Sequence, residues 1–152
     1  MLRDEINTAI KEAMKAQDKL RVSTLRLVNA ALKDRDIAAR TEGKDPLSDD
    51  SFRILLSKMV KQREESARIY EENGRPELAQ QERGEIAVIL DFLPRQFNEA
   101  QTRAAISAVM TEIEAKGIKD LRRTMAVLKE RHAGAIDFGK ASAWVKDALT
   151  AD

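Results

Sequence analysis

Apolar residues recur every three or four positions along almost the whole chain, and this spacing constrains the fold more than any other feature. Leu25, Val28 and Leu32, for example, share one face of a helix. Only 6 Gly and 3 Pro occur in 152 residues, which is little turn material for a many-stranded β fold. Aromatic residues make up 4% of the chain, so the core must be mostly aliphatic. The sequence predicts an all-α protein.

The first part of the chain indicates a bundle of about four helices. Ser48 is a good N-cap because its hydroxyl can accept a backbone N–H of the first turn. The next helix boundary is indicated by Asn73 and Gly74 at a C-terminus and by Pro76, which suits a first helical turn. The predicted helices span residues 2–14, 18–40, 49–72 and 76–93.

A break at Leu93 and Pro94 divides the chain. Proline disfavours helix at the residue before it and cannot donate to the helical ladder, so these two residues are predicted to form a hinge. Asn98 then begins a second set of three helices, near residues 98–116, 119–131 and 137–150. We therefore expect an N-terminal helical domain at 1–95 and a C-terminal three-helix domain at 98–152.

Composition and motifs exclude several kinds of chemistry. The chain has no cysteine, which rules out disulfides and thiolate catalysis, and a reducing compartment fits this composition. His132 is the single histidine and lacks a glutamate three residues earlier, so a di-metal helical bundle is excluded. Its place near a helix end predicts a solvated or dipole-capping role. We predict no catalytic residue, metal or cofactor. With no apolar targeting or membrane-spanning segment, we expect a cytoplasmic protein.

One segment resembles a phosphate-binding loop. Residues 134–141 match G-x-x-x-x-G-K but end in Ala141, where the motif needs the Ser or Thr hydroxyl that ligates magnesium. A polar helix end precedes it, whereas a phosphate loop follows a buried strand. The interpretation favoured here is a turn between helices, with Gly134 leaving one helix and Asp137 capping the next.

Charge is balanced overall but segregated along the chain. There are 27 Lys and Arg against 26 Asp and Glu, yet residues 116–131 carry a net +4, as do residues 53–63, and residues 64–85 carry −4. Clustered cations can contact phosphates, but charge runs of this kind more often form a solvated helix surface or an intramolecular match with the acidic segment. The candidate nucleic-acid-binding residues are Lys116, Lys119, Arg122, Arg123, Lys129, Arg131, Lys140 and Lys146.

The chain resembles the GatB/YqeY domain family over essentially its whole length. The segments that carry the resemblance are 18–26, 74–79, Glu82-Arg83-Gly84-Glu85-Ile86, Phe92-Leu93-Pro94-Arg95-Gln96-Phe97, 125–129 and 134–137. The resemblance implies an all-helical protein in two parts. Its C-terminal part is similar to the tail of GatB, the amidotransferase subunit whose tail helps to hold tRNA. Arg122, Glu130 and Ala135 stand where the family often has Gly, Pro and Arg.

Three functions follow as hypotheses. The first is a non-catalytic accessory protein that binds tRNA or another RNA, mainly by its backbone and shape because few aromatic rings accompany the basic residues. The second is an adaptor that docks to an amidotransferase or an aminoacyl-tRNA synthetase. The third is the family label, a carbon–nitrogen ligase with glutamine as amido-N-donor, for which no nucleophile or ATP site is recognisable. The oligomeric state is left open.

Overall fold

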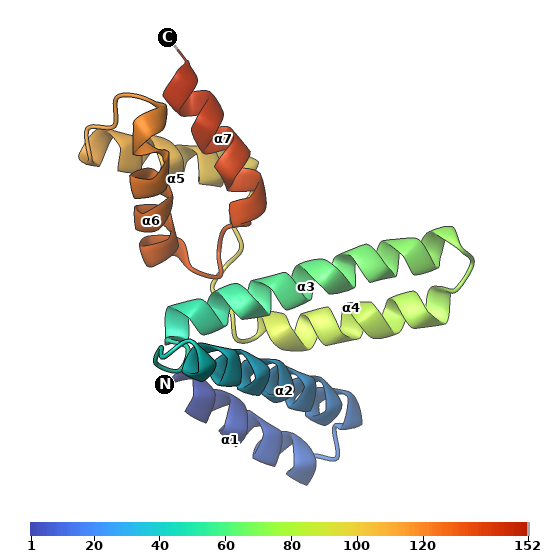
Figure 1. The fold of residues 1–152 in the computed structure, drawn as a ribbon. Coiled ribbons are helices and arrows are strands. Elements are labelled where there is room, and N and C mark those ends of the chain that lie inside the picture. Colours follow the sequence, from blue (N-terminus) through green and yellow to red (C-terminus); the bar gives the residue numbers. More distant parts are fainter. Residues whose placement is uncertain (152) are drawn as a thin grey trace. The chain divides into compact units, whose positions relative to one another are not determined.

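The prediction of an all-α fold is confirmed. The computed structural model describes residues 1–151, and within that range it has seven α-helices, one 3₁₀ turn and no strand (Figure 1). The helices are α1 (Leu2–Lys15), α2 (Lys19–Thr41), α3 (Asp49–Glu72), α4 (Pro76–Leu90), α5 (Glu99–Glu112), α6 (Leu121–His132) and α7 (Phe138–Thr150), with the 3₁₀ turn η1 (Ile118–Asp120) before α6. Contacts divide the chain into an N-terminal unit, Met1–Leu93, and a C-terminal unit that begins at Pro94.

The N-terminal unit is built on a long α3–α4 hairpin. α2 packs along α4, and α1 packs on α2 (Figure 1). Most residues of the apolar stripes predicted from the sequence form its core, because each helix turns one face toward the others. Met14 of the first predicted stripe and Leu78 and Leu90 of the fourth are exposed instead. Fully buried members of this core are Ile6, Leu25, Val28, Phe52, Leu56 and Ile89.

The Glu82–Ile86 segment, which contributes to the family resemblance, holds α4 against its neighbours. A Cβ on Gly84 would lie 2.8 Å from Cδ2 of Leu20, so glycine permits the close approach of α2 and α4. Arg83 donates to Glu71 of α3 at 2.9 Å through Nε. Glu85 is buried and pairs with Arg63 of α3, with Nε and Oε2 3.4 Å apart. These residues therefore have a structural role in packing α4 against α2 and α3.

A polar network ties the start of α1 to the end of α2. Arg3 donates to both carboxylate oxygens of Asp36, at 2.6 and 2.9 Å, and to the carbonyl of Leu47 at 2.7 Å. The same carboxylate accepts the N–H of Leu47 at 2.9 Å. The Arg3 side chain is 27% exposed and that of Asp36 is 24% exposed, so the pair is partly shielded from water. The network fixes the loop between α2 and α3.

Helix starts follow the capping residues read from the sequence, but two helices end earlier than predicted. α5 ends at Glu112 and not at residue 116, and Glu114 just beyond it has a positive φ of 53°. Ser48 accepts the N–H of Ser51 at 3.1 Å, α4 begins at Pro76, and Gly74 has φ +70° after α3. The fourth helix ends at Leu90, three residues before the predicted end. Residues 91–93 instead make tight bonds to carbonyls three positions back, because the proline that follows prevents a regular helical turn.

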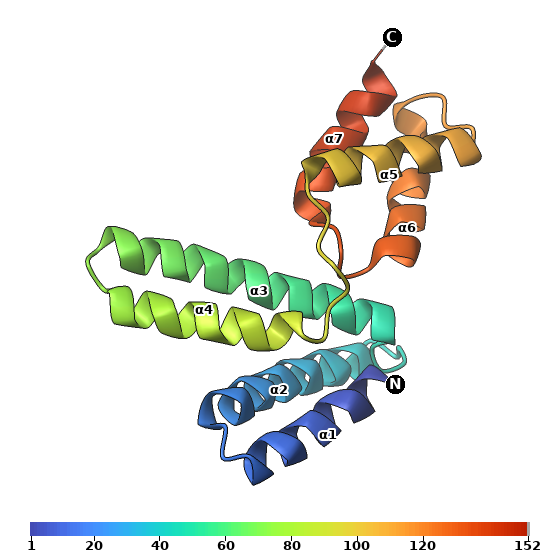
Figure 2. The same ribbon diagram turned by 180° about the vertical axis from the view of Figure 1, so that it is seen from behind.

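The C-terminal unit contains α5, α6 and α7 around a second core, made chiefly of Ile106, Val109, Leu128, Ile136, Ala141 and Val145 (Figures 1 and 2). Asn98 and Gln101 form the predicted capping box at the start of α5. The segment before α5 belongs to this unit: Gln96 donates to the carbonyl of Gly134 at 2.7 Å, and the Phe97 N–H donates to Ala135 at 2.9 Å.

Leu93 and Pro94 lie on the two sides of the division between the units. Leu93 packs against the N-terminal core, and Pro94 begins the C-terminal unit. Their role as a hinge, and the domain bounds 1–95 and 98–152, stay predictions.

Replacing Asp36 with alanine is expected to lower the free energy of unfolding of the N-terminal unit by about 2 kcal/mol, because Arg3 and the Leu47 N–H lose their shared partner. Urea unfolding followed by circular dichroism measures the loss. Asp34→Ala is the matched control, since Asp34 is exposed on the same helix and makes no hydrogen bond or ion pair among residues 1–151. An equal loss in both variants would contradict the importance of the network.

The same network makes stability depend on pH. The hydrogen bond from Arg3 lowers the pKa of Asp36, with a further contribution from the Leu47 N–H and an opposing effect of burial. Stabilisation by a carboxyl with a lowered pKa is complete above its ordinary value of about 3.9 and is lost as the pH falls through the folded-state value. The difference in unfolding free energy between the wild type and Asp36→Ala should therefore shrink under acid conditions.

Candidate nucleic-acid interface

The connection from α5 to α6 is organised by a single carboxylate. Asp120 accepts the backbone N–H of Lys116 at 2.7 Å and of Gly117 at 3.4 Å. These hydrogen bonds lower the pKa of Asp120, with help from the positive charges of Arg123 and Lys119 and against the effect of burial. Lys116 and Lys119 are both exposed on this connection, immediately before α6.

Two of the eight candidate cations are held in contacts within the unit. Arg123 donates to the carbonyl of Ile113 at 2.9 Å and to Asp120 at 3.2 Å. Arg131 donates from its two terminal guanidinium nitrogens, Nη1 and Nη2, to the carboxylate of Glu112 on α5, at 2.6 and 2.5 Å. These hydrogen bonds lower the pKa of the Glu112 carboxyl. A phosphate of a nucleic acid would have to compete with these partners. Both arginines are therefore weaker candidates for contacts with a nucleic-acid backbone than the sequence indicated.

The other cations on α6 share one side of the helix. Arg122 and Lys129 are seven residues apart, about two helical turns, and both are exposed. Neither side chain makes a hydrogen bond or ion pair with the rest of the described chain. Arg131 lies nine residues after Arg122 and so on the opposite side of α6, facing Glu112. We call Arg122 and Lys129 the α6 flank.

The two candidates on α7 are not brought together. Lys140 and Lys146 are both exposed, and their six-residue separation places them on different sides of the helix. Of the eight candidates, Arg122 and Lys129 thus lie on one side of α6, whereas two others, Arg123 and Arg131, form ion pairs. The remaining four lie on the connection before α6 and on α7.

The loop that resembles a phosphate-binding motif is a turn between helices. Gly134 has φ +83°, and Gly134, Ala135 and Ile136 are buried. The Asp137 carboxylate accepts the N–H groups of Gly139 and Lys140 at 3.0 and 3.3 Å. The amides at the start of α7 are therefore used by the chain's own cap, as the sequence interpretation expected. Among residues 1–151, no group of three or more His, Asp or Glu side chains could hold a metal ion.

His132 differs from the dipole-capping cation that the sequence predicted. Its ring is half-buried at the end of α6, with its centroid 5.0 Å from that of Phe97. Burial lowers the pKa of His132, and the positive charge of Arg131 lowers it further. The imidazole is therefore favoured in its neutral form, as a packing group beneath the segment that enters α5.

One pair of functional interest was missed by sequence reasoning. The guanidinium of Arg103 lies over the Trp144 ring, 5.0 Å from its centroid, on the α5–α7 side of the unit. Helical spacing places Trp144 beside the apolar stripe of the last helix, and nothing in the sequence singles out Arg103. The two residues are 41 positions apart, so only packing of α5 against α7 brings them together.

Comparison with known proteins gives one family. The model of the family described as "Yqey-like protein" matches residues 3–149. A protein of Lachancea thermotolerans named "Altered inheritance of mitochondria protein 41, mitochondrial" is 34% identical over 107 residues, which are 69% of this chain and 56% of that protein. The protein of the same name from Eremothecium gossypii is 33% identical over 84 residues, 55% of this chain and 44% of its own.

The chain spans about half the length of these curated relatives, 56% and 44%. The names of these relatives describe them as mitochondrial, and a cytoplasmic location for this chain stays a prediction. Within residues 1–151, none of the helices combines the length and apolar content needed to cross a membrane.

The stability of the C-terminal unit should fall as the pH is lowered from neutral. The unfolded chain takes up a proton near the ordinary histidine pKa of about 6.5, whereas folded His132 resists it, so stability is lost between that value and the lower folded-state pKa. Urea unfolding followed by the fluorescence of Trp144, the one tryptophan of the chain, measures this loss. The His132→Gln variant should lose less stability over the same range, and an unchanged slope would contradict the assignment.

Proposed function

The chain belongs to the YqeY-like protein family, and on that premise we propose that it is a non-catalytic accessory protein that binds tRNA or a similarly structured RNA through its C-terminal unit. The observation that carries the proposal is the α6 flank, where Arg122 and Lys129 present positive charge without a partner in the described chain. Lys116 and Lys119 add exposed charge immediately before it. Cations in this arrangement suit contacts with a phosphate backbone.

The resemblance of the C-terminal part to the GatB tail supports tRNA as the RNA. A folded RNA offers phosphates and 2′-hydroxyls on a defined shape, which a helical surface can contact without reading bases. The α6 flank has no aromatic side chain for base stacking: between residues 116 and 131 the sequence contains no Phe, Tyr or Trp. The proposal is therefore backbone and shape recognition.

The chemistry of the chain supports a non-catalytic role. No cysteine is available as a nucleophile, and the single histidine packs against Phe97 with a lowered pKa. The N-terminal amides of α7, which a phosphate loop would use, already bond to Asp137. An amide-forming ligase would need a glutaminase nucleophile and an ATP site, and these residues supply neither.

Replacing Lys119, Arg122 and Lys129 together with alanine should weaken tRNA binding and flatten its salt dependence. The slope of log K against log[salt] is expected to fall by about one for each phosphate contact removed. Fluorescence anisotropy with labelled tRNA over a salt series measures both quantities. The triple variant Lys11→Ala, Lys15→Ala and Lys33→Ala is the matched control, because it removes the same charge from exposed positions of the N-terminal unit.

Single variants sharpen the test. Arg131→Ala should reduce affinity less than Arg122→Ala, because Arg131 is engaged with Glu112. No tRNA binding at low salt, or equal losses in the α6 and control variants, would contradict RNA binding at this surface. Turnover of glutamine with ATP by the purified chain would contradict the non-catalytic role.

A further inference from the structure

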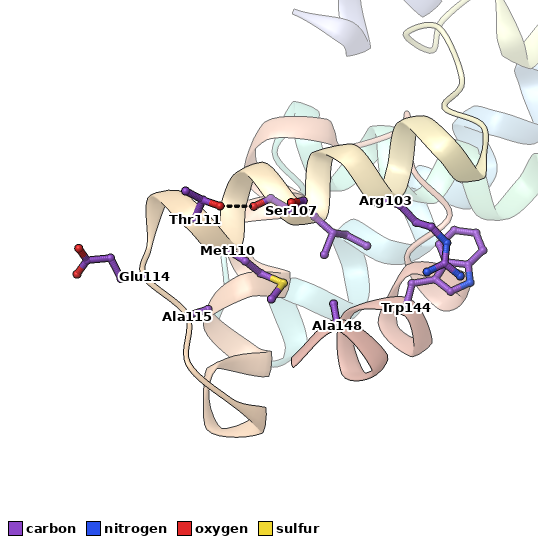
Figure 3. Close-up of a pocket in the computed structure, with 9 residues that line it drawn as sticks. Arg103, Ser107, Met110, Thr111, Glu114, Ala115, Trp144 and Ala148 are labelled. Atoms are coloured by element: carbon purple, nitrogen blue, oxygen red, sulfur yellow. Dashed lines mark hydrogen bonds between the residues drawn. The ribbon is translucent and has the colours of Figure 1, made fainter. Parts of the chain in front are cut away.

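A groove between α5 and α7 lies on the C-terminal unit and has no part in the proposed RNA contact. Its cavity measures about 370 Å³, within the range of about 300–1,000 Å³ typical of binding pockets. Figure 3 shows Met110 and Ala148 at its centre, with Arg103 and Trp144 together at one end. We call this surface the α5–α7 groove.

The groove follows the helical repeat of the elements that form it. On α5, Arg103, Ser107 and Thr111 succeed one another at intervals of four residues, and on α7 Trp144 and Ala148 have the same spacing. Ser107, Thr111 and Ala148 have small side chains, which allow another backbone to come close. The Thr111 hydroxyl donates to the Ser107 carbonyl at 3.0 Å and so does not project as a free donor (Figure 3). This shape fits the apolar face of a helix.

The positive charge at the groove is that of Arg103, at the end where Trp144 lies. The Arg103 guanidinium rests over the indole, and its ion-pair partner is Glu99, with Nε and Oε2 3.3 Å apart. Both side chains of that pair are at least half exposed, 50% and 62%, so the pair is weak and a carboxylate from a partner can replace Glu99. Glu114, at the other end, points away from the cavity (Figure 3).

We propose that the α5–α7 groove binds an α-helix of another protein. The helix presents two large apolar side chains one turn apart to the space beside Met110 and Ala148, and a carboxylate one turn further on pairs with Arg103. A protein fits better than RNA here, because Arg103 is the one cation among the residues that line the groove, whereas contacts with a phosphate backbone use several cations. A floor of Ile106 and Met110 with a polar rim is typical of protein interfaces.

A displayed library of helical peptides tests the proposal on the full-length chain. The probe is an alanine-based peptide of about 18 residues, long enough to hold a helix, with one face randomised. Selection should enrich sequences with apolar residues at i and i+4 and an Asp or Glu one turn away. Binding is then measured by the fluorescence of Trp144, because this residue lines the groove and is the one tryptophan of the chain.

Two exposed neighbours on α5 supply a matched pair of variants. Ser107→Lys places a long charged side chain in the groove and should weaken the selected peptide by about tenfold or more, whereas Ala108→Lys, on another side of α5, should leave affinity within about twofold. Arg103→Glu should weaken the acidic peptide, and exchanging the peptide's acid for lysine should restore binding. Circular dichroism checks that each variant is folded.

Three results would overturn the proposal. One is a selection without the apolar and acidic pattern, and another is peptide binding that Ser107→Lys does not affect. The third is a single-stranded RNA that changes Trp144 fluorescence at physiological salt and loses this effect in Ser107→Lys, since the groove would then be an RNA site. The Lys119, Arg122 and Lys129 variant should leave peptide binding unchanged, which keeps this test separate from that of RNA binding.

Discussion

Burial of aliphatic stripes at helical spacing is the constraint on which both units depend. With aromatic residues at only 4% of the chain, no single large ring can fill a core, so several helices must contribute Leu, Ile, Val and Ala side chains to each one. Each helix can bury only one stripe, and the remaining faces carry the charged residues that make up 35% of the sequence. The arrangement of these outer faces decides which surfaces can bind a partner.

Ion pairs account for part of this outer charge. Arg3 with Asp36 and Arg63 with Glu85 are partly shielded and join consecutive helices, α1 with α2 and α3 with α4. Arg131 with Glu112 is exposed and contributes little to stability, yet it removes one cation from the set available to phosphates. The near-neutral net charge of the chain therefore includes two kinds of cation, those in ion pairs and those without an acidic partner. The cations of the α6 flank are available to a phosphate because no acid of the described chain pairs with them.

The C-terminal unit carries two surfaces with different chemistry. The α6 flank is cationic and lacks aromatic residues, which suits an RNA backbone, whereas the α5–α7 groove is apolar with a mixed-charge rim, which suits a protein helix. The two surfaces are formed by different helices, so the two proposed contacts do not compete for the same residues. The Glu82–Ile86 segment, by contrast, packs α4 against α2 and α3.

Much of the fold was predictable from the sequence, because its determinants are local. Apolar spacing, the caps at Ser48, Asn98 and Asp137, and the break at Pro94 each act within one or two helical turns, so helix number and most boundaries followed from them. The predicted ends of α4 and α5 were wrong by three and four residues. Residues 91–93 form a tight turn before Pro94, and Leu93 packs against the N-terminal core.

The sites needed tertiary structure because they depend on pairing between helices. The sequence determined which residues are charged, but it could not say that Arg131 meets Glu112, 19 residues away, or that Arg122 meets no acid within the described chain. The sequence predicted a solvated or dipole-capping role for His132. Its ring instead packs against Phe97, and burial lowers its pKa. Packing of α5 against α7 created the contact of Arg103 with Trp144. Local rules set the helices, and the geometry of their packing set the surfaces.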